Sequence, residues 1–264
     1  MEKYDVKFKK KFGQNFLKDV KVVDNIIDVA DIKDNSLVIE VGPGGAILTK
    51  KLASNAKKVV AFEIDIDLEK ELNKKLVDFN NIDILFGDFL KRDLVEDLKK
   101  YEYDYLYFIS NVPYYITTPI ILKLLESGLN FTKIVMMVQK EVGERFSAKP
   151  CSKNYGSISV YLNYFYDINY EFFVGRDEFV PAPNVDSCII SFTAKKDLLK
   201  LNDMNKFENL IKDSFMFKRK NLRNNLKKYN LELVSFILGE FGYDLSNRAE
   251  EIPYNIFVEL SNRL

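Results

Sequence analysis

The chain has 264 residues, of which 47% are hydrophobic and 30% charged, a composition typical of a globular protein with a substantial core. It contains no histidine and only two cysteines, Cys151 and Cys188, which excludes Ser-His-Asp and Cys-His catalysis and argues against a zinc site or a disulfide framework. The 39 basic and 39 acidic residues balance, and no apolar run reaches the length of a signal peptide or a membrane span, so we expect a cytoplasmic protein.

From about residue 36 the sequence alternates between apolar runs of strand length and segments of helix length. The expected strands cover residues 37–41, 58–62, 82–86, 104–109 and 133–138. Strands separated in this way are typical of βαβ units and of a parallel sheet covered by helices on both faces. Residues 157–169, rich in Tyr and Phe, and residues 185–194 are expected to add later strands, antiparallel at one edge. The predicted fold is therefore α/β and Rossmann-like.

The character of the sequence changes after Ala194. Residues 195–203 are expected to form a linker, and residues 204–264 a small helical module. Breaks in that module are expected near Asn230, Gly239–Gly242 and Pro253. The sequence thus predicts two domains, residues 1–194 and residues 204–264.

The charges are unevenly distributed along the chain. Residues 1–21 hold seven lysines and three acidic residues, and residues 206–228 hold eight lysines and arginines and two acidic residues. Two basic segments on either side of an acidic middle indicate a polyanion held at the edges of a compact site. Lysine-rich helix faces exposed to solvent would give the same pattern, so the charges alone leave both interpretations open.

Three expected strands end in residues suited to an adenosine-containing ligand. Gly42 and Gly44 follow the first strand, where glycines allow a tight turn and close approach of a ligand to the backbone. Glu63 follows the second strand, where a carboxylate can accept hydrogen bonds from both ribose hydroxyls. Asp88 follows the third, where a carboxylate can accept an N–H of adenine.

A dinucleotide and S-adenosylmethionine both contain adenosine. A dinucleotide turn requires a third glycine at position 47 so that the helix can close on the strand, and this chain has Ile47. S-adenosylmethionine contains no pyrophosphate, so that glycine is unnecessary for it. The turn therefore favours S-adenosylmethionine, with a dinucleotide as the alternative.

The fourth strand ends in Asn111-Val112-Pro113-Tyr114, a loop suited to holding a planar amine. The Asn111 side chain and the Val112 carbonyl are two hydrogen-bond acceptors, and Pro113 has no N–H to compete with them. Two acceptors on an exocyclic amine would stabilise the positive charge that develops when the amine attacks a sulfonium methyl. Tyr114 offers a ring on which the base can stack.

Other interpretations of this loop remain open. It could be an ordinary turn at a strand end with a buried tyrosine. DNA adenine methyltransferases and protein glutamine methyltransferases also use an Asn-x-Pro-aromatic loop. The loop alone therefore predicts methyl transfer to a planar amine and leaves the polymer undecided.

Several stretches match, in order, the motifs of one family. They are Lys11-Phe12-Gly13-Gln14-Asn15-Phe16-Leu17, Glu40-Val41-Gly42-Pro43-Gly44, Glu63, Gly87-Asp88, Asn111-Val112-Pro113-Tyr114 and Phe179-Val180-Pro181-Ala182-Pro183-Asn184-Val185-Asp186-Ser187. This combination resembles the ribosomal RNA adenine dimethyltransferases from residue 8 to the end of the chain. Two branches share the motifs: housekeeping small-subunit enzymes linked to kasugamycin sensitivity, and large-subunit enzymes that confer macrolide resistance.

The C-terminal module discriminates between the branches. Residues 217–226 and 248–253 look like the small-subunit branch. The resemblance implies a class I methyltransferase sheet with a helical C-terminal domain for RNA recognition. It also implies N6-dimethylation of two adjacent adenines in the 3′-terminal stem-loop of 16S ribosomal RNA in an immature small subunit. A macrolide-resistance enzyme and an assembly factor without activity are the alternatives.

The resemblance also implies roles for individual residues. The methyl donor would be lined by Asn15, Leu17, Gly42, Glu63, Asp88 and Asn111. Tyr114 would stack on the target base and Phe179 would supply the opposite wall. Phosphates would be held by Lys218, Arg219, Lys220 and Arg223. We expect a monomer that uses S-adenosylmethionine and no metal.

Overall fold

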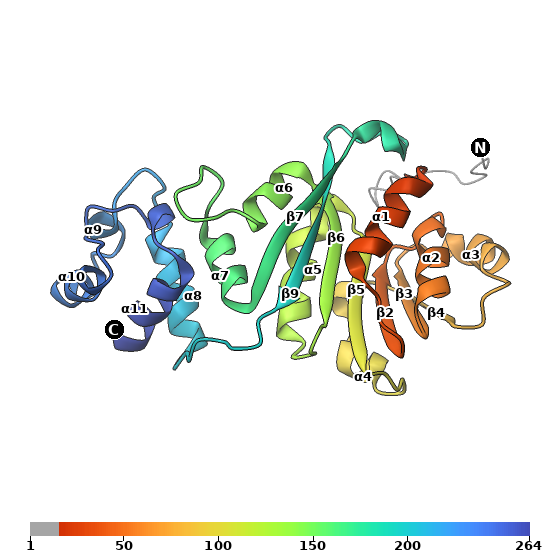
Figure 1. Ribbon diagram of the computed structural model, residues 1–264, viewed down its shortest axis with the longest axis horizontal. Helices are drawn as coiled ribbons and strands as arrows, with labels where there is room; N and C mark the ends of the chain where they lie inside the picture. The colour runs from red at the N-terminus through yellow and green to blue at the C-terminus, as the bar shows by residue number, and fades with distance from the viewer. Residues whose placement is uncertain (1–15) are drawn as a thin grey trace. The chain divides into compact units, whose positions relative to one another are not determined.

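The computed structural model describes residues 16–264, which form two compact units (Figure 1). The first unit comprises the described residues up to Gly143 together with Asn169–Ala194. The second comprises Glu144–Ile168 and Lys195–Leu264. Within the part of the chain that is described, no helix combines the length and the apolar character needed to cross a membrane.

The first unit is built on a seven-stranded sheet. Its strands are β2 (Ser36–Val41), β3 (Lys58–Glu63), β4 (Ile82–Phe86), β5 (Tyr105–Asn111), β6 (Lys133–Gln139), β7 (Tyr166–Val174) and β9 (Ser187–Ala194). The order across the sheet is β4-β3-β2-β5-β6-β9-β7. Neighbouring strands from β4 to β6 run parallel, and β9 pairs antiparallel with β6. The expected strands at 37–41, 58–62, 82–86, 104–109, 133–138 and 185–194 are confirmed.

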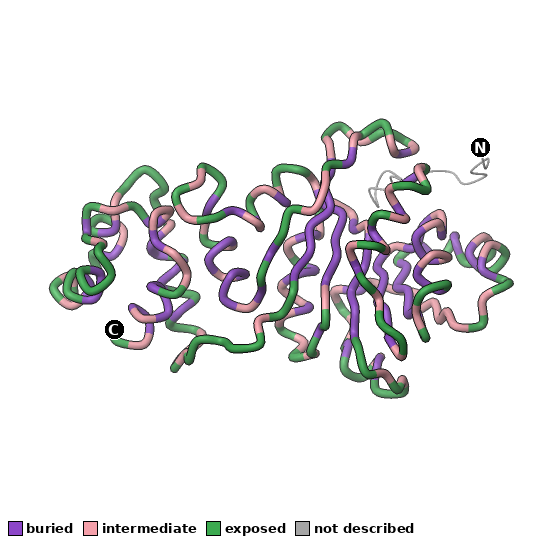
Figure 2. Tube along the Cα trace, in the orientation of Figure 1, coloured by how far each residue is buried: buried purple, intermediate pink, exposed green. Residues whose placement is uncertain are grey.

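The central strands are buried on both faces, as expected for a parallel sheet covered by helices (Figure 2). One face carries α1 (Val20–Ala30), α2 (Ile47–Asn55) and α3 (Glu69–Lys75), which share apolar clusters with the strands. The other face carries the 3₁₀ turn η3 (Phe89–Lys91), α4 (Leu94–Leu98) and α5 (Thr117–Glu126). There the ring of Phe89 packs on Phe62 of β3 and Phe108 of β5, with centroids 5.1 and 6.1 Å apart.

Short elements complete the first unit. They are η2 (Ile66–Leu68), η4 (Tyr114–Ile116), η5 (Arg176–Glu178) and the first four residues of α6 (Lys140–Phe146). A separate two-stranded sheet joins β1 (Phe16–Leu17) to β8 (Phe179–Val180) in antiparallel register. It holds the beginning of the described chain against the segment that precedes β9.

The second unit is helical. Its elements are α7 (Ser157–Phe165), α8 (Met204–Ser214), α9 (Leu222–Asn225), α10 (Leu231–Glu240), η6 (Ala249–Glu251) and α11 (Tyr254–Arg263). Their apolar faces form one cluster of buried residues. The expected breaks are confirmed, because the side chain of Asn230 caps α10, that helix ends at Glu240, and Pro253 precedes α11.

The strand expected over residues 157–169 is wrong in its first part. Residues 157–165 form helix α7, and the chain becomes extended only at Tyr166. Val160 and Tyr164 lie four positions apart and are both buried in the helical cluster, where the Tyr164 ring lies 5.3 Å from that of Phe207. Burial of one helix face in that cluster outweighs the strand preference of aromatic residues.

The division of the chain also differs from the expected boundaries. The break after Ala194 coincides with a boundary between the units, but Glu144–Ile168 belongs to the helical unit. Because α7 contributes buried residues to the same cluster as α8 and α11, the second unit is assembled from two separate stretches of sequence. A composition change along the chain reveals only one of them.

Close packing around Cys188 on β9 explains a glycine in α6. Cys188 is fully buried, which confirms that it is a core residue. A Cβ added at Gly143 would overlap with the Cys188 sulfur and would lie 3.1 Å from the Ile190 side chain. We therefore predict that Gly143→Ala lowers the free energy of unfolding by about 1–3 kcal/mol, the usual cost of overpacking. Urea denaturation measures it.

The control is the double variant Gly143→Ala, Cys188→Ala, in which the overlapping sulfur is absent. It should be more stable than the single Gly143→Ala variant. Equal stability of the single and the double variants would show that the sulfur is not the obstacle.

Candidate active site

The strand ends bring four predicted residues to one edge of the sheet. Asp88 follows β4, Glu63 ends β3, Gly42 follows β2 and Asn111 ends β5. These four strands are direct neighbours in the order β4-β3-β2-β5, and all run parallel. The four residues therefore lie in the same order along the carboxyl edge of the sheet.

The sheet changes its winding direction between β2 and β5. The helix that follows β2 lies on one face, and the helix that follows β5 lies on the other. Ligands of open α/β sheets bind in the crevice outside the strand ends at such a point. Gly42 and Asn111 lie on its two sides.

A buried hydroxyl holds the two strands together at this point. The β2/β5 ladder is formed as far as Ile39 and Phe108. Beyond it, Ser110 Oγ donates to the Val41 carbonyl at 2.7 Å and accepts from the Val41 N–H at 3.2 Å. Ser110 therefore fixes the position of its neighbour Asn111 relative to the glycine turn.

The glycine turn after β2 leaves room beside its backbone. Gly42 has a φ of +74°, which favours glycine, and its N–H donates to the Phe62 carbonyl at 2.8 Å. A Cβ added at Gly42 would meet no atom within 4 Å, and the same holds at Gly87, whose φ is +131°. Open space at both glycines fits a ligand that approaches the backbone closely.

Glu63 is buried at the end of β3 and bound to two backbone groups. Its Oε1 accepts the N–H of Asp65 at 2.8 Å, and its Oε2 accepts the N–H of Gly44 at 3.3 Å. Burial raises the pKa of Glu63, and these two N–H groups act in the opposite direction. Each carboxylate oxygen has a further lone pair, so Glu63 can still accept two hydroxyl groups.

Asp88 occupies the turn after β4. Its Oδ1 accepts the N–H of Leu90 at 3.0 Å and caps η3, and its Oδ2 lies 3.9 Å from the Lys91 ammonium group. The side chain is about one-third exposed, so it can also reach a ligand. Tyr115, half exposed on η4, lies near this carboxylate, which contributes to the raised pKa of the Tyr115 phenol after the larger effect of burial.

The Asn111-to-Tyr114 loop is anchored at both ends. Val112 is buried, and the Ile116 N–H donates to the Pro113 carbonyl at 3.1 Å. The Tyr114 hydroxyl lies 2.5 Å from Ser187 Oγ at the start of β9. Burial raises the pKa of Tyr114, and the contact with Ser187 ties its ring to the start of β9.

Three predicted residues lie near the small β1/β8 sheet or before it. Leu17 pairs with Phe179, and both are buried in the core of the first unit. Phe179 is only 2% exposed, so a base could contact its ring only after local rearrangement. Asn15 lies outside the described residues, as do the lysines of the segment 1–21 that precede residue 16.

Sequence reasoning missed three side chains at this edge. Ser110 and Ser187 position Asn111 and Tyr114, respectively. Glu40, on β2, is 2% exposed, and its Oε2 has no hydrogen-bond partner among residues 16–264. Glu40 and Ser187 stand within the matched motifs without an assigned role, and Ser110 directly precedes Asn111; a polar residue inside an apolar strand was the available signal.

The buried Glu40 carboxyl supports a polar ligand at this edge. Unpaired polar atoms are rare in protein cores, and one beside a glycine turn is typical of a site completed by a bound group. Burial raises the pKa of Glu40 to about 8; the Thr49 hydroxyl acts in the opposite direction, and the charge of Glu63 adds to the increase. With the space at Gly42 and the acceptors of Glu63, the residues present fit an adenosine ligand with a charged polar tail.

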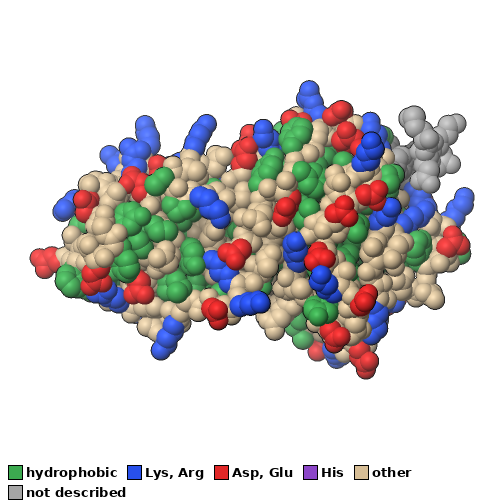
Figure 3. Space-filling view, viewed as in Figure 1, with side chains coloured by type: hydrophobic (Ala, Val, Ile, Leu, Met, Phe, Trp, Pro, Cys, Tyr) green, Lys and Arg blue, Asp and Glu red, His purple; other side chains and the backbone are tan. Residues whose placement is uncertain are grey.

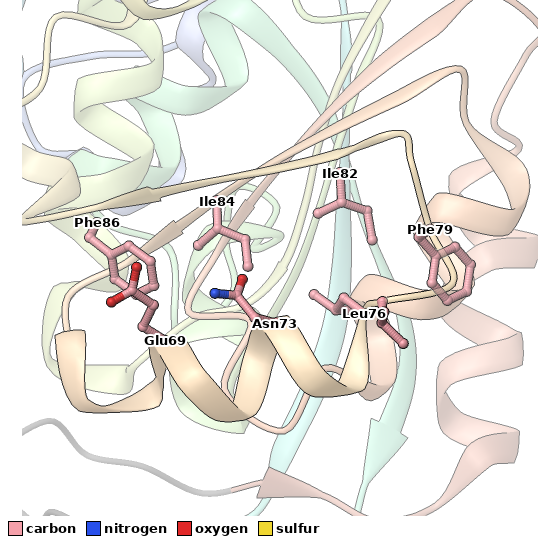
Figure 4. Close-up of a pocket in the computed structure, with 8 residues that line it drawn as sticks. Glu69, Asn73, Leu76, Phe79, Ile82, Ile84 and Phe86 are labelled. Atoms are coloured by element: carbon pink, nitrogen blue, oxygen red, sulfur yellow. The ribbon is translucent and has the colours of Figure 1, made fainter.

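A cavity of about 370 Å³ elsewhere in the first unit has a different character (Figure 4). It lies between α3 and the edge strand β4. The lining residues are Glu69, Asn73, Leu76, Val77, Phe79, Ile82, Ile84 and Phe86. Six of its eight lining residues are apolar, and it runs along the edge strand, which separates it from the candidate site at the strand ends.

The predicted basic cluster lies in the helical unit, around the start of α9. Lys218, Arg219, Lys220 and Arg223 are all exposed. Among residues 16–264 none of the four has a carboxylate within 4 Å, and the Lys218 ammonium donates to the Lys153 carbonyl at 3.3 Å. Basic side chains gather along the upper rim of this unit in Figure 3.

Comparisons with known proteins agree over the whole chain. A family model described as "Ribosomal RNA adenine dimethylase" matches residues 5–264. The ribosomal RNA small subunit methyltransferase A proteins of Bacillus mycoides (strain KBAB4) and Bacillus cereus (strain B4264) are each 43% identical to this chain, covering 100% of it and 94% of their own length.

Two solved structures share the fold of both units. A dimethyladenosine transferase from Plasmodium falciparum has a TM-score of 0.78 and 28% identity, covering 92% of this chain and 95% of its own. The 23S rRNA methyltransferase ErmE has a TM-score of 0.76 and 26% identity, covering 95% of this chain and 99% of its own.

The buried Glu40 carboxyl makes stability depend on pH. In the unfolded chain this group ionises near pH 4.5, and in the folded protein near pH 8, so between these values the folded state holds a proton that the unfolded state has lost. The contribution of Glu40 to the free energy of unfolding of wild type is therefore fully present at low pH and is lost as the pH rises towards 8. The free energy of unfolding of Glu40→Gln, measured relative to wild type, should therefore increase by up to about 1.4 kcal/mol per pH unit between pH 5 and 8.

Urea denaturation of both proteins at pH 5, 6, 7 and 8 measures this difference. The other titrating groups are shared and cancel in the comparison. A difference that stays constant across the range would show that Glu40 is ionised in the folded protein.

Proposed function

The chain belongs to the ribosomal RNA adenine dimethylase family, and we propose that it methylates N6 of two adjacent adenines in the 3′-terminal stem-loop of 16S ribosomal RNA. Each adenine receives two methyl groups. The observation that carries the proposal is the full-length 43% identity to small-subunit methyltransferases, combined with the alignment of four motif residues along one sheet edge.

The small-subunit substrate is favoured over the large-subunit one. Identity to the small-subunit methyltransferases is 43%, against 26% to the 23S rRNA methyltransferase ErmE. Both share the fold, so the fold itself does not discriminate. The C-terminal residues 217–226 and 248–253 resemble the small-subunit branch, in agreement with this difference.

The methyl donor that fits the first unit is S-adenosylmethionine, which supplies an electrophilic methyl group on a sulfonium centre. Asp88 would accept from the adenine, Glu63 from the ribose hydroxyls, and the Gly42 turn would face the amino-acid part. This assignment follows the order of the strand ends across the sheet. Leu17 and Asn15 would complete the donor site from the N-terminal side.

Asn111 and Val112 would hold the target amine beside the donor. An aromatic amine is a weak nucleophile because its lone pair is delocalised into the ring. Acceptors on its N–H groups stabilise the charge that develops as the nitrogen reacts, and fixed acceptors need no reorganisation. The anchoring of Asn111 by Ser110 supplies this fixed geometry.

The target base must leave its stack to reach this loop. Tyr114, oriented through Ser187, would stack on one face of the base, and Phe179 is proposed as the opposite wall. The cost of unstacking is smaller in a loop than in a duplex. The cluster Lys218, Arg219, Lys220 and Arg223 would bind phosphates of the same RNA, with residues 204–264 as the RNA-recognition domain.

We further propose that the enzyme acts as a monomer in the cytoplasm on an immature small subunit. A role as an assembly factor without activity is the second candidate, and the presence of Asn111, Tyr114 and Glu63 in their positions at the sheet edge argues against it.

Asn111→Ala should lower methyl transfer at least about 100-fold, because it removes a fixed acceptor from the developing charge. The assay uses labelled donor with immature small subunits, and the label should enter 16S ribosomal RNA and not 23S ribosomal RNA. Asn55→Ala, at an exposed position at the end of α2, is the matched control and should keep full activity.

Calorimetry should show that Asn111→Ala binds S-adenosylmethionine nearly as tightly as wild type. Turnover close to that of wild type in the Asn111 variant would rule out the acceptor role. Label in large-subunit RNA would assign the enzyme to the resistance branch.

Glu63→Ala should weaken S-adenosylmethionine binding by about 1–3 kcal/mol, the scale of hydrogen bonds to a charged group. Calorimetric titration measures the change. Glu69→Ala on α3 is the control for loss of an exposed carboxylate, and thermal unfolding checks that the Glu63 variant is folded. Unchanged affinity would contradict the ribose assignment.

A further inference from the structure

An exposed aromatic residue lies within the basic segment between α8 and α9. Phe217 is 58% exposed and directly precedes Lys218, Arg219 and Lys220, and its neighbour Met216 is 59% exposed. Single exposed hydrophobic residues are common on protein surfaces and need no explanation by themselves. Two further observations distinguish this one.

First, the segment is held in a defined conformation. The side chain of Asn225 accepts the N–H of Phe217 at 3.2 Å and donates to the Ser214 carbonyl at 2.7 Å. The Lys220 N–H donates to the Phe217 carbonyl at 2.8 Å, which closes a turn. The exposed ring is therefore presented on an anchored turn, and its ordering costs little when a partner binds.

Second, the segment is anchored to the core from one side only. Leu222 of α9 and Leu226, which follows this helix, are fully buried, and the Phe215 ring packs 6.0 Å from that of Phe257. Phe215 thus packs into the helical cluster, while Phe217 is exposed and is followed by the exposed Lys218, Arg219 and Lys220, none of which has a carboxylate within 4 Å among residues 16–264. Apolar area beside unpaired positive charge matches a partner that is aromatic and negatively charged.

We propose that Phe217 is a stacking platform for an unpaired base of the RNA substrate, with Lys218, Arg219 and Lys220 on the flanking phosphates. This inference rests on the proposed function and deepens it, because it names how the second unit selects unpaired RNA. Stacking of a base on an aromatic ring tolerates any base, and phosphate contacts carry no sequence information. The platform therefore selects for unpaired nucleotides and leaves the choice of adenine to the first unit.

The test measures binding of the full-length chain to two synthetic RNAs: a hairpin with an unpaired loop, and a fully paired duplex of the same length. Phe217→Ala should weaken hairpin binding about 5- to 150-fold, the range measured for loss of one stacked base. It should leave duplex binding within twofold of wild type. Phe217→Tyr should bind the hairpin like wild type, whereas Phe217→Leu should bind as weakly as Phe217→Ala.

Salt dependence separates stacking from charge. Replacing Lys218, Arg219 and Lys220 with alanine should reduce the slope of log affinity against log salt on both RNAs, because fewer counterions are released. Phe217→Ala should leave that slope unchanged. The matched control is Phe236→Ala on α10, where the exposed ring already lies 5.8 Å from the Arg263 guanidinium, and hairpin binding should not change.

Three outcomes would overturn the proposal. Hairpin affinity of Phe217→Ala within twofold of wild type would show that no base stacks on the ring. Full hairpin affinity in Phe217→Leu would show that the contact is apolar and not aromatic. Weaker binding of Phe217→Ala to intact subunits, with unchanged binding to the hairpin, would assign the surface to a ribosomal protein.

Methyl transfer by wild type distinguishes a failure of this inference from a failure of the proposed function. If wild type methylates 16S ribosomal RNA and the Phe217 variants bind the hairpin normally, only the platform is wrong. If wild type methylates no ribosomal RNA and Phe217→Ala still weakens hairpin binding, only the proposed function is wrong.

Discussion

The separation of β2 and β5 at their carboxyl ends is the constraint on which the active site depends. The helices that follow these two strands cover opposite faces of the sheet, and open α/β sheets bind their ligands outside the strand ends at such a point. The hydroxyl of Ser110 bridges the Val41 N–H and carbonyl just where the ladder stops. The strands are therefore open enough to admit ligands and still fixed relative to each other, which is what a pair of static acceptors requires.

Electrostatics at this edge follow from the same opening. Two carboxyl groups, Glu40 and Glu63, are buried within one region of the first unit, and burial raises the pKa of each. Keeping such groups inside a protein costs stability, and natural proteins tolerate that cost mainly at functional sites. Glu63 offsets part of it through the N–H groups of Gly44 and Asp65, whereas Glu40 Oε2 is left without a partner among the described residues. This difference in backbone hydrogen bonding between the two carboxyl groups fits a sheet edge that binds a charged, polar methyl donor.

The two units divide the tasks of one enzyme. The first unit carries the glycine turn and the residues proposed as acceptors, Asn111 and Val112. The second unit presents exposed cations on a segment anchored by Asn225 and by the buried side chains of Leu222 and Leu226. In the proposed function, chemistry uses groups fixed within a sheet, and RNA binding uses groups fixed on a helical surface. In both units a single side chain, Ser110 or Asn225, holds the segment that carries the proposed site residues.

The alternation of strands and helices, the break after Ala194 and the identity of the motif residues were determined by the sequence alone, because period and turn chemistry are local properties. Only the tertiary structure decided that residues 157–165 are helical, since burial of Val160 and Tyr164 against α8 overrides their strand preference. It also decided that residues 144–168 join the C-terminal unit, that Phe179 is buried, and that Ser110 bonds to Val41 and Ser187 to Tyr114 beside the proposed site. These features depend on contacts between residues distant in sequence, and such contacts leave no period or spacing along the chain.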